Sequence, residues 1–184
     1  MKGIVFREFL EMVEESFGMN VADQIIEESD LPSGGAYTSV ATYDHHEILT
    51  LVGKLHEQTQ VPVPDLVRAF GRHLFQRFVA LYPGFFAGVP SAFAFLQRID
   101  GIIHVEVRKL YPDAELPAFD CEPLGSDRLA MTYRSQRPFA ELAEGLIEGC
   151  VEYFKEPITI EREDLEGAPG ETRARFLLTK RSAA

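Results

Sequence analysis

The spacing of apolar residues changes near residue 111, and this change constrains the fold of the chain more than any other feature. In the first part, apolar side chains recur every three or four positions, as they do in amphipathic helices. After residue 116, short runs rich in β-branched and aromatic residues alternate with turns, which indicates strands. Helices followed by strands, with one further helix among them, predict an α+β fold.

The pattern predicts six helices and four strands within a single domain that covers residues 1–184. Asp44 is expected to cap the third helix with Glu47 in the capping-box position, and the chain is expected to fray from Lys180 onward. The expected helices are 5–17, 19–28, 44–55, 66–81, 91–110 and 139–154, and the expected strands are 117–122, 128–133, 158–161 and 172–178.

The charge balance narrows the classes of partner. The chain carries 29 acidic and 18 basic side chains, a formal net charge of −11. Neither nucleic acid nor an anionic membrane is expected as a partner, because binding to both relies on positive charge. No window approaches the roughly 20 apolar residues of a spanning helix, and acidic residues follow the start too soon for a signal peptide. We expect a cytoplasmic protein with Cys121 and Cys150 reduced.

The histidines are the first candidates for metal chemistry. His45 and His46 are neighbours near a helix start, and because adjacent helical residues do not share a face, no joint metal site is expected there. His56 and His73 are expected at the surface. His104 lies among branched aliphatic side chains inside a predicted long helix. On these residues alone, an ordinary core histidine is the favoured interpretation of His104.

A second candidate is the polar triplet Tyr133, Ser135 and Arg137, which follows a predicted strand. In an extended segment these three side chains point to one side, and all can donate hydrogen bonds. Either a solvated strand edge or a clamp for an anion fits this pattern. No phosphate loop, serine-nucleophile elbow, zinc helix or cysteine-pair site appears, and the many carboxylates are interpreted as solvated helix faces.

The triplet resembles the Tyr-x-Ser-x-Arg hallmark of the haem nitric oxide/oxygen binding (H-NOX) family, which bacterial gas sensors share with soluble guanylate cyclase. Residues 1–5 (MKGIV) resemble the start of that family, and residues 95–107 around Ile103-His104 resemble its helix with the proximal histidine. Residues 110–119 (LYPDAELPAF) and 143–149 (AEGLIEG) are similar to the segments that follow. These elements occur in the family's order over nearly the whole chain.

The resemblance implies an H-NOX fold, with an N-terminal helical subdomain packed on a C-terminal subdomain that contains a small antiparallel sheet. Haem b would lie between the distal part, residues 1–60, and the proximal part, residues 61–184. His104 would be the axial ligand of the haem iron. Pro117 would press on the haem and distort it. Tyr133, Ser135 and Arg137 would hold the haem propionates, and Ile4, Val5, Phe78, Leu142 and Leu146 would line the macrocycle.

The resemblance also implies a function. Oxygen-holding members carry a distal tyrosine whose hydroxyl donates to bound dioxygen, and the matching residue here is Leu142. We therefore expect a sensor, not an enzyme, that binds nitric oxide and carbon monoxide at ferrous haem and excludes oxygen. A change in ligation at His104 would signal to a separate effector, such as a histidine kinase or a diguanylate cyclase.

Two alternatives remain open at this point. One is an oxygen-binding haem protein or haem enzyme, although no distal histidine or arginine is evident. The other is a haem-free interaction module of the same fold, against which the presence of His104 and the triplet argues. The zinc site of some bacterial relatives is not expected, because residues 161–172 contain neither cysteine nor histidine.

Overall fold

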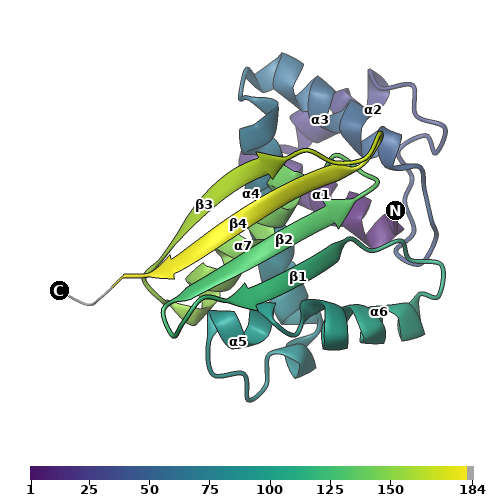
Figure 1. The fold of residues 1–184 in the computed structure, drawn as a ribbon. Coiled ribbons are helices and arrows are strands. Elements are labelled where there is room, and N and C mark those ends of the chain that lie inside the picture. Colours follow the sequence, from purple (N-terminus) through teal and green to yellow (C-terminus); the bar gives the residue numbers. More distant parts are fainter. Residues whose placement is uncertain (182–184) are drawn as a thin grey trace.

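The computed structural model describes residues 1–181 and combines helices with one four-stranded antiparallel sheet (Figure 1). This confirms the predicted α+β fold. The elements are α1 (Gly3–Phe17), α2 (Met19–Glu27), α3 (His45–Thr59), α4 (Val63–Leu81), the short 3-10 helix η1 (Pro83–Phe85), α5 (Ala92–Leu96), the π-helical turn η2 (Ile99–Ile103), α6 (His104–Leu110), β1 (Ala118–Pro123), β2 (Arg128–Ser135), α7 (Ala140–Phe154), β3 (Ile158–Leu165) and β4 (Thr172–Lys180).

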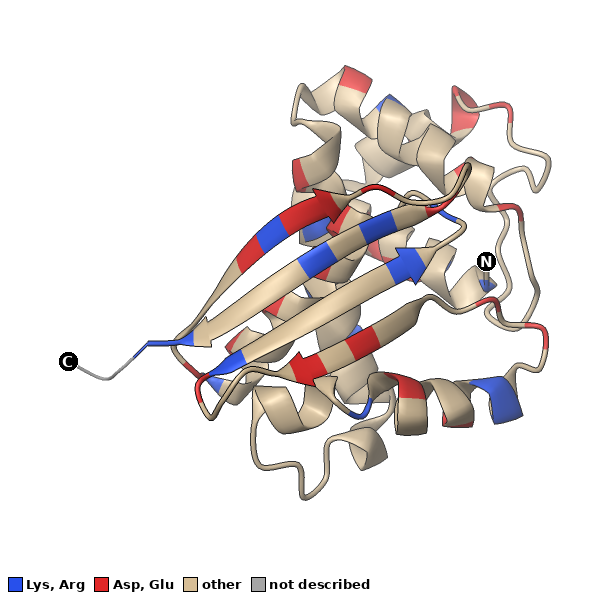
Figure 2. Cartoon of the chain, in the orientation of Figure 1, with Lys and Arg blue, Asp and Glu red and all other residues tan. Residues whose placement is uncertain are grey.

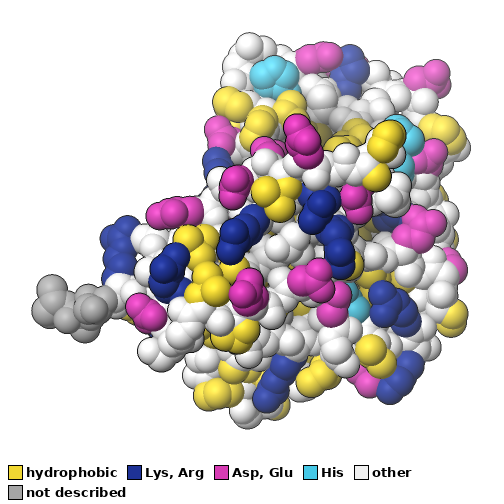
Figure 3. All heavy atoms as spheres, in the orientation of Figure 1, with side chains coloured by type: hydrophobic (Ala, Val, Ile, Leu, Met, Phe, Trp, Pro, Cys, Tyr) yellow, Lys and Arg dark blue, Asp and Glu magenta, His cyan; other side chains and the backbone are white. Residues whose placement is uncertain are grey.

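The sheet has the strand order β1-β2-β4-β3, so the last strand of the chain lies beside β2 in the middle. Alternate residues of β4, namely Ala174, Phe176 and Leu178, are fully buried and form part of the core between sheet and helices. Helices α7 and α4 lie behind one face, as Figure 1 shows. The other face carries interspersed charged side chains of both signs (Figures 2 and 3).

Helices α4 and α7 approach each other unusually closely, and glycine makes this possible. A Cβ atom placed on Gly145 of α7 would lie 2.0 Å from the backbone oxygen of Arg68 in α4. A Cβ atom on Gly71 of α4 would lie 2.5 Å from the backbone oxygen of Leu142. Two buried clusters meet around this contact, one under the sheet and one among α1 to α4.

The prediction of one long helix over residues 91–110 is wrong. Helix α5 ends at Leu96, and the chain then makes the wide turn η2 before α6 begins. In this turn the backbone N–H groups of Ile102 and Ile103 both donate to the oxygen of Arg98, at 2.9 and 3.0 Å. Such π-helical turns often occur at functional sites. His104 is therefore the first residue of α6 rather than an interior residue of a long helix.

The predicted start of the third helix is only half right. The Asp44 carboxylate caps α3 by accepting a hydrogen bond from the backbone N–H of His46, at 2.9 Å. Glu47 does not complete a capping box, because its buried carboxylate accepts from the hydroxyls of Ser33 and Tyr37. Glu47 instead fixes the loop before α3.

The structure also corrects the expected exposure of Glu8, His73 and His56 and the expected fraying at Lys180. Glu8 is 5 % exposed rather than solvated, and its carboxylate accepts from Arg77 Nε at 2.6 Å. His73 lies beside it with a side chain only 13 % exposed, and His56 is half-buried. Lys180 is not frayed, since its backbone N–H donates to Asp127 at 2.7 Å, whereas residues 182–184 lie outside the described residues.

Candidate functional site

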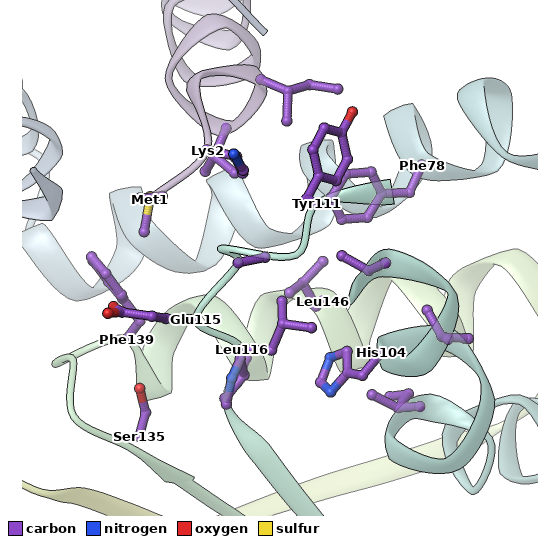
Figure 4. A pocket seen from close by; sticks show the side chains of 18 of the residues that line it. Met1, Lys2, Phe78, His104, Tyr111, Glu115, Leu116, Ser135, Phe139 and Leu146 are labelled. Carbon is purple, nitrogen blue, oxygen red and sulfur yellow. The ribbon is translucent and has the colours of Figure 1, made fainter. Parts of the chain in front are cut away.

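A cavity of about 690 Å³ opens between the helical half of the chain and the sheet, and Figure 4 shows it from close by. Its volume falls in the range of sites that hold drug-sized ligands and cofactors. The walls come from α1, the loop before α3, α4, α5 to α6, the segment 111–117, β2 and α7. Among the residues predicted for the site, the cavity is lined by Ile4, Val5, Phe78, His104, Pro117, Tyr133, Ser135, Arg137 and Leu146.

Leu142 is the exception, because it is not among the residues that line this cavity. Its side chain packs against the buried cluster of α1 to α4 instead of lining the cavity. The close contact of Gly71 with the Leu142 backbone explains this, because the first turn of α7 is pressed against α4. Helix α7 and its N-cap present other residues to the cavity, and all are apolar: Phe139, Ala143, Leu146 and Ile147.

His104 is held in the cavity wall by a carboxylate one helical turn before it. The Asp100 Oδ1 atom lies 2.7 Å from His104 Nδ1, and Asp100 Oδ2 accepts a hydrogen bond from the backbone N–H of Phe119 at 2.9 Å. One side chain thus joins η2, α6 and the start of β1. With Nδ1 engaged, the imidazole has Nε2 left for a ligand.

The protonation state of His104 suits a ligand role. The residue is 9 % exposed, and burial lowers the pKa of its imidazole, although the Asp100 carboxylate opposes this shift. A lowered pKa keeps the ring neutral at pH 7, and only a neutral imidazole nitrogen can ligate a metal. Sequence reasoning assigned no role to Asp100, although its spacing of four residues from His104 in a helical segment is the signal that could have found it.

The polar triplet lies across the cavity from α6, at the end of β2. Tyr133 is buried, and that burial raises its pKa. Ser135 Oγ accepts a hydrogen bond from the backbone N–H of Arg137 at 3.0 Å. The Arg137 guanidinium pairs with the carboxylate of Glu115, whose side chain is 79 % exposed. The structure thus brings the three predicted residues together, with the arginine fork in contact with a carboxylate.

The cavity wall also contains an ion pair that sequence reasoning missed. Lys2 Nζ lies 2.7 Å from Asp113 Oδ1, and the Thr42 hydroxyl donates to Asp113 Oδ2 at 2.7 Å. The ammonium also lies 5.3 Å from the ring centre of Tyr111. These contacts join the N-terminus and the loop before α3 to the segment that follows α6. We call Lys2, Thr42 and Asp113 the latch.

Two further phenols, Tyr43 and Tyr82, lie in the cavity wall. Tyr43 Oη accepts from the backbone N–H of Thr38 at 2.9 Å. Burial is the largest cause that raises the pKa of Tyr82. The residues that α1, α4 and α7 contribute to the cavity are all apolar: Ile4, Val5, Phe75, Phe78, Ala143, Leu146 and Ile147.

No helix within residues 1–181 is both long enough and apolar enough to cross a bilayer.

Comparison with known proteins agrees with this arrangement. The family model "Haem-NO-binding" matches residues 2–162 of the chain. The unliganded Fe(II) H-NOX protein of K. algicida is 39% identical, with a TM-score of 0.91 over 100% of this chain and 98% of that one. The IWP-051-bound H-NOX of Shewanella woodyi in the Fe(II)CO state is 44% identical, with a TM-score of 0.83 over 99% and 95%.

A more distant relative has the same fold. The Fe(II)NO form of an H-NOX protein from S. oneidensis is 27% identical, with a TM-score of 0.89 over 99% of this chain and 100% of that one. No curated protein matches the chain. The family match spans most of the sequence, and the structural matches span nearly all of it. This chain belongs to the haem-NO-binding, or H-NOX, family of haem-based gas sensors.

Proposed function

We propose that this protein is a non-enzymatic sensor that binds nitric oxide and carbon monoxide at ferrous haem b, excludes oxygen and signals to a separate effector. The observation that carries the proposal is the placement of a neutral, carboxylate-held imidazole opposite an arginine fork across one cavity. Haem bound there would supply the iron that takes up a diatomic gas.

The residues in the cavity fit this cofactor. His104 offers Nε2 as an axial ligand, since Asp100 already holds Nδ1. The haem propionates are carboxylates, and Arg137 already binds the Glu115 carboxylate in the position where the clamp is expected to act. Tyr133 and Ser135 add hydroxyl donors beside the guanidinium. Between His104 and the polar triplet, apolar side chains such as Phe78 and Leu146 line the cavity and would contact the faces of the macrocycle.

The apolar wall supports nitric oxide and carbon monoxide over oxygen. Bound dioxygen acquires negative charge and is stabilised by a hydrogen-bond donor, whereas nitric oxide and carbon monoxide bind iron without one. Helix α7 and its N-cap contribute only Phe139, Ala143, Leu146 and Ile147 to the cavity. We first argued from Leu142 that the wall has no hydrogen-bond donor for bound oxygen. Leu146 supports the same conclusion, because its side chain also has no hydrogen-bond donor.

The position of His104 supports a route for the signal. As the first residue of α6, it links any displacement of its ring directly to that helix. Asp100 opposes such a displacement through its bond to the Phe119 backbone. This region also carries exposed Ile102 and Val105, at 50% and 39% exposure, which do not line the cavity and which an effector could cover. A histidine kinase or a diguanylate cyclase is the proposed effector.

Replacing His104 with Gly tests the axial assignment. We expect His104→Gly to lose most of its haem on purification and to regain it when imidazole is supplied, because free imidazole can fill the space left by the ring. Absorbance of haem relative to protein measures the retained fraction. The exposed His46 gives a matched control, since His46→Gly should retain haem as the wild type does. Unchanged haem content and spectrum in His104→Gly would show that another residue ligates the iron.

A further inference from the structure

A second group of metal-ligating side chains lies at the rim of the cavity. Asp44, His45 and His46 place one ligand atom each within 4.8 Å of one another. The Asp44 Oδ1 atom lies 3.4 Å from His45 Nδ1 and 2.8 Å from His46 Nδ1. The centres of the two imidazole rings are 4.2 Å apart. No other group of three ligating side chains converges in this way within residues 1–181.

The expectation that the adjacent histidines could not converge is wrong, and the reason is local. Asp44 is the N-cap of α3, with extended backbone at φ −64° and ψ 131°, so its side chain turns back over the first turn. His45 and His46 occupy that first turn, where both rings reach the same carboxylate. The rule that neighbouring helical residues face apart applies inside a helix and not at its cap.

His46 Nδ1 and Asp44 Oδ1 are hydrogen-bonded to each other at 2.8 Å, and a bound ion would replace this bond. Asp44 Oδ1 accepts the capping hydrogen bond from the His46 backbone, and Asp44 Oδ2 has no hydrogen-bond partner within residues 1–181. The His46 side chain is 72 % exposed and free to turn, whereas that of His45 is 22 % exposed and packs edge-on against Phe139. The group thus combines one fixed imidazole, one adjustable imidazole and one free carboxylate oxygen.

We propose that Asp44, His45 and His46 form a binding site for a borderline divalent transition-metal ion such as Zn²⁺, Ni²⁺ or Cu²⁺. Two imidazole nitrogens and one carboxylate oxygen form a ligand set that these ions favour, whereas Mg²⁺ prefers oxygen ligands alone. Three protein ligands on an exposed helix end leave a coordination position for water. Asp44 and His45 also line the cavity, so this site lies at its rim, and it uses side chains other than the proposed iron ligand His104.

An ion bound to Asp44, His45 and His46 would also affect the loop before α3. The residue before the cluster, Tyr43, donates its backbone N–H to Met1 at 2.9 Å, and His45 itself lines the cavity. An ion bound to the cluster would fix the loop that holds the N-terminal segment against the cavity wall. Arg137 lies close enough to His45 to oppose further positive charge, so we expect moderate rather than very tight affinity.

Calorimetric titration of tag-free, full-length protein with Zn²⁺ and with Ni²⁺ tests the proposal. We expect saturable binding of one ion per chain for each metal and no comparable binding of Mg²⁺. His46→Ala and Asp44→Asn should each weaken the binding by more than about tenfold. Asn caps a helix as well as Asp does, so Asp44→Asn removes the charged ligand without removing the cap.

His56→Gln is the matched control, because His56 lies at the far end of α3 and should not affect the titration. Circular dichroism of each variant verifies that α3 remains folded. The proposal is overturned if wild-type protein shows no saturable binding of either ion. It is equally overturned if binding persists unchanged in both His46→Ala and Asp44→Asn, since the ions would then occupy another site.

Discussion

At the scale of single residues, Asp100 determines how His104 can act. Its carboxylate holds His104 Nδ1 at 2.7 Å and the Phe119 backbone N–H at 2.9 Å, so the ring has one orientation and one free nitrogen. A carboxylate acceptor on the far side of a ligating histidine also makes the ligating nitrogen more basic. Asp100 is therefore a positioning residue for the proposed iron ligand.

Replacing Asp100 with Asn should weaken the bond between iron and His104. The amide is a weaker acceptor than the carboxylate, so His104 Nε2 becomes less basic, and we expect haem affinity to fall by about 10- to 100-fold. Resonance Raman spectroscopy of the ferrous protein should show the iron–histidine stretch at lower frequency. The positioning role is disproved if both the stretch and the haem dissociation rate match the wild type.

Residue identity alone predicted only part of the site. Tyr133, Ser135 and Arg137 were found by their spacing, and the structure brings them together at the end of β2. His104 was identified through the family resemblance rather than through periodicity. The convergence of Asp44, His45 and His46 was missed because it depends on the backbone at a helix cap.

At the scale of elements, the crossing of α4 and α7 shapes the cavity wall. The close contact of Gly71 with the Leu142 backbone presses the first turn of α7 against α4, so that Leu142 packs against the helical cluster whereas Leu146 lines the cavity. The sequence does not predict this crossing of α4 and α7. Small residues in a helix permit a close contact, but they do not specify which other helix packs there.

Replacing Gly145 with Ala should destabilise the protein by about 1–3 kcal/mol, the usual cost of an overpacked contact. The added methyl would meet the backbone oxygen of Arg68, which cannot move aside as a flexible side chain could. Urea unfolding measures the change in the free energy of unfolding. Gly53 in α3 is the matched control, since a Cβ atom there meets nothing within 4 Å.

The control should change stability in the opposite direction. Gly53→Ala places a better helix former in an open position and should stabilise α3 by up to about 1 kcal/mol. If Gly145→Ala and Gly53→Ala have the same effect, then the contact between α4 and α7 does not depend on glycine.

Hydrophobic periodicity predicted most of the elements but not the break between α5 and α6. Ile99, Ile102 and Ile103 continue a helical apolar pattern through η2, so the local signal favours an unbroken helix. The bond of Asp100 to the Phe119 backbone stabilises the interrupted form. That contact joins residues far apart in the chain, and periodicity carries no information about it.

At the scale of the whole molecule, the latch links the N-terminal part of the chain to the segment that follows α6. Hydrogen bonding to Lys2, the largest cause, lowers the pKa of Asp113 from 3.8 to about 2. The folded chain therefore keeps Asp113 ionised at pH values where the unfolded chain already binds a proton. The latch therefore stabilises the folded chain fully above about pH 4. This stabilisation is lost as the pH falls toward 2.

Asp113→Asn should reveal this pH dependence in thermal unfolding. We expect the variant to unfold at a lower midpoint than the wild type between pH 5 and pH 8, by an amount constant over that range. The difference should shrink below about pH 4, where the wild-type carboxyl of the unfolded chain is protonated. A difference that changes between pH 5 and pH 8 would mean that another titrating group controls the latch.

The whole arrangement combines a buried histidine held by a carboxylate, a clamp for carboxylates and an apolar wall, and the central claim drawn from it concerns the gas that is sensed. The most direct measurement is the visible spectrum of the reduced, haem-loaded protein under nitrogen, then with nitric oxide, carbon monoxide and air in turn. We predict that nitric oxide and carbon monoxide each shift the Soret band, and that air produces no stable ferrous oxygen complex. A stable oxygen complex in air would contradict the account, because no donor is expected in the wall formed by α7.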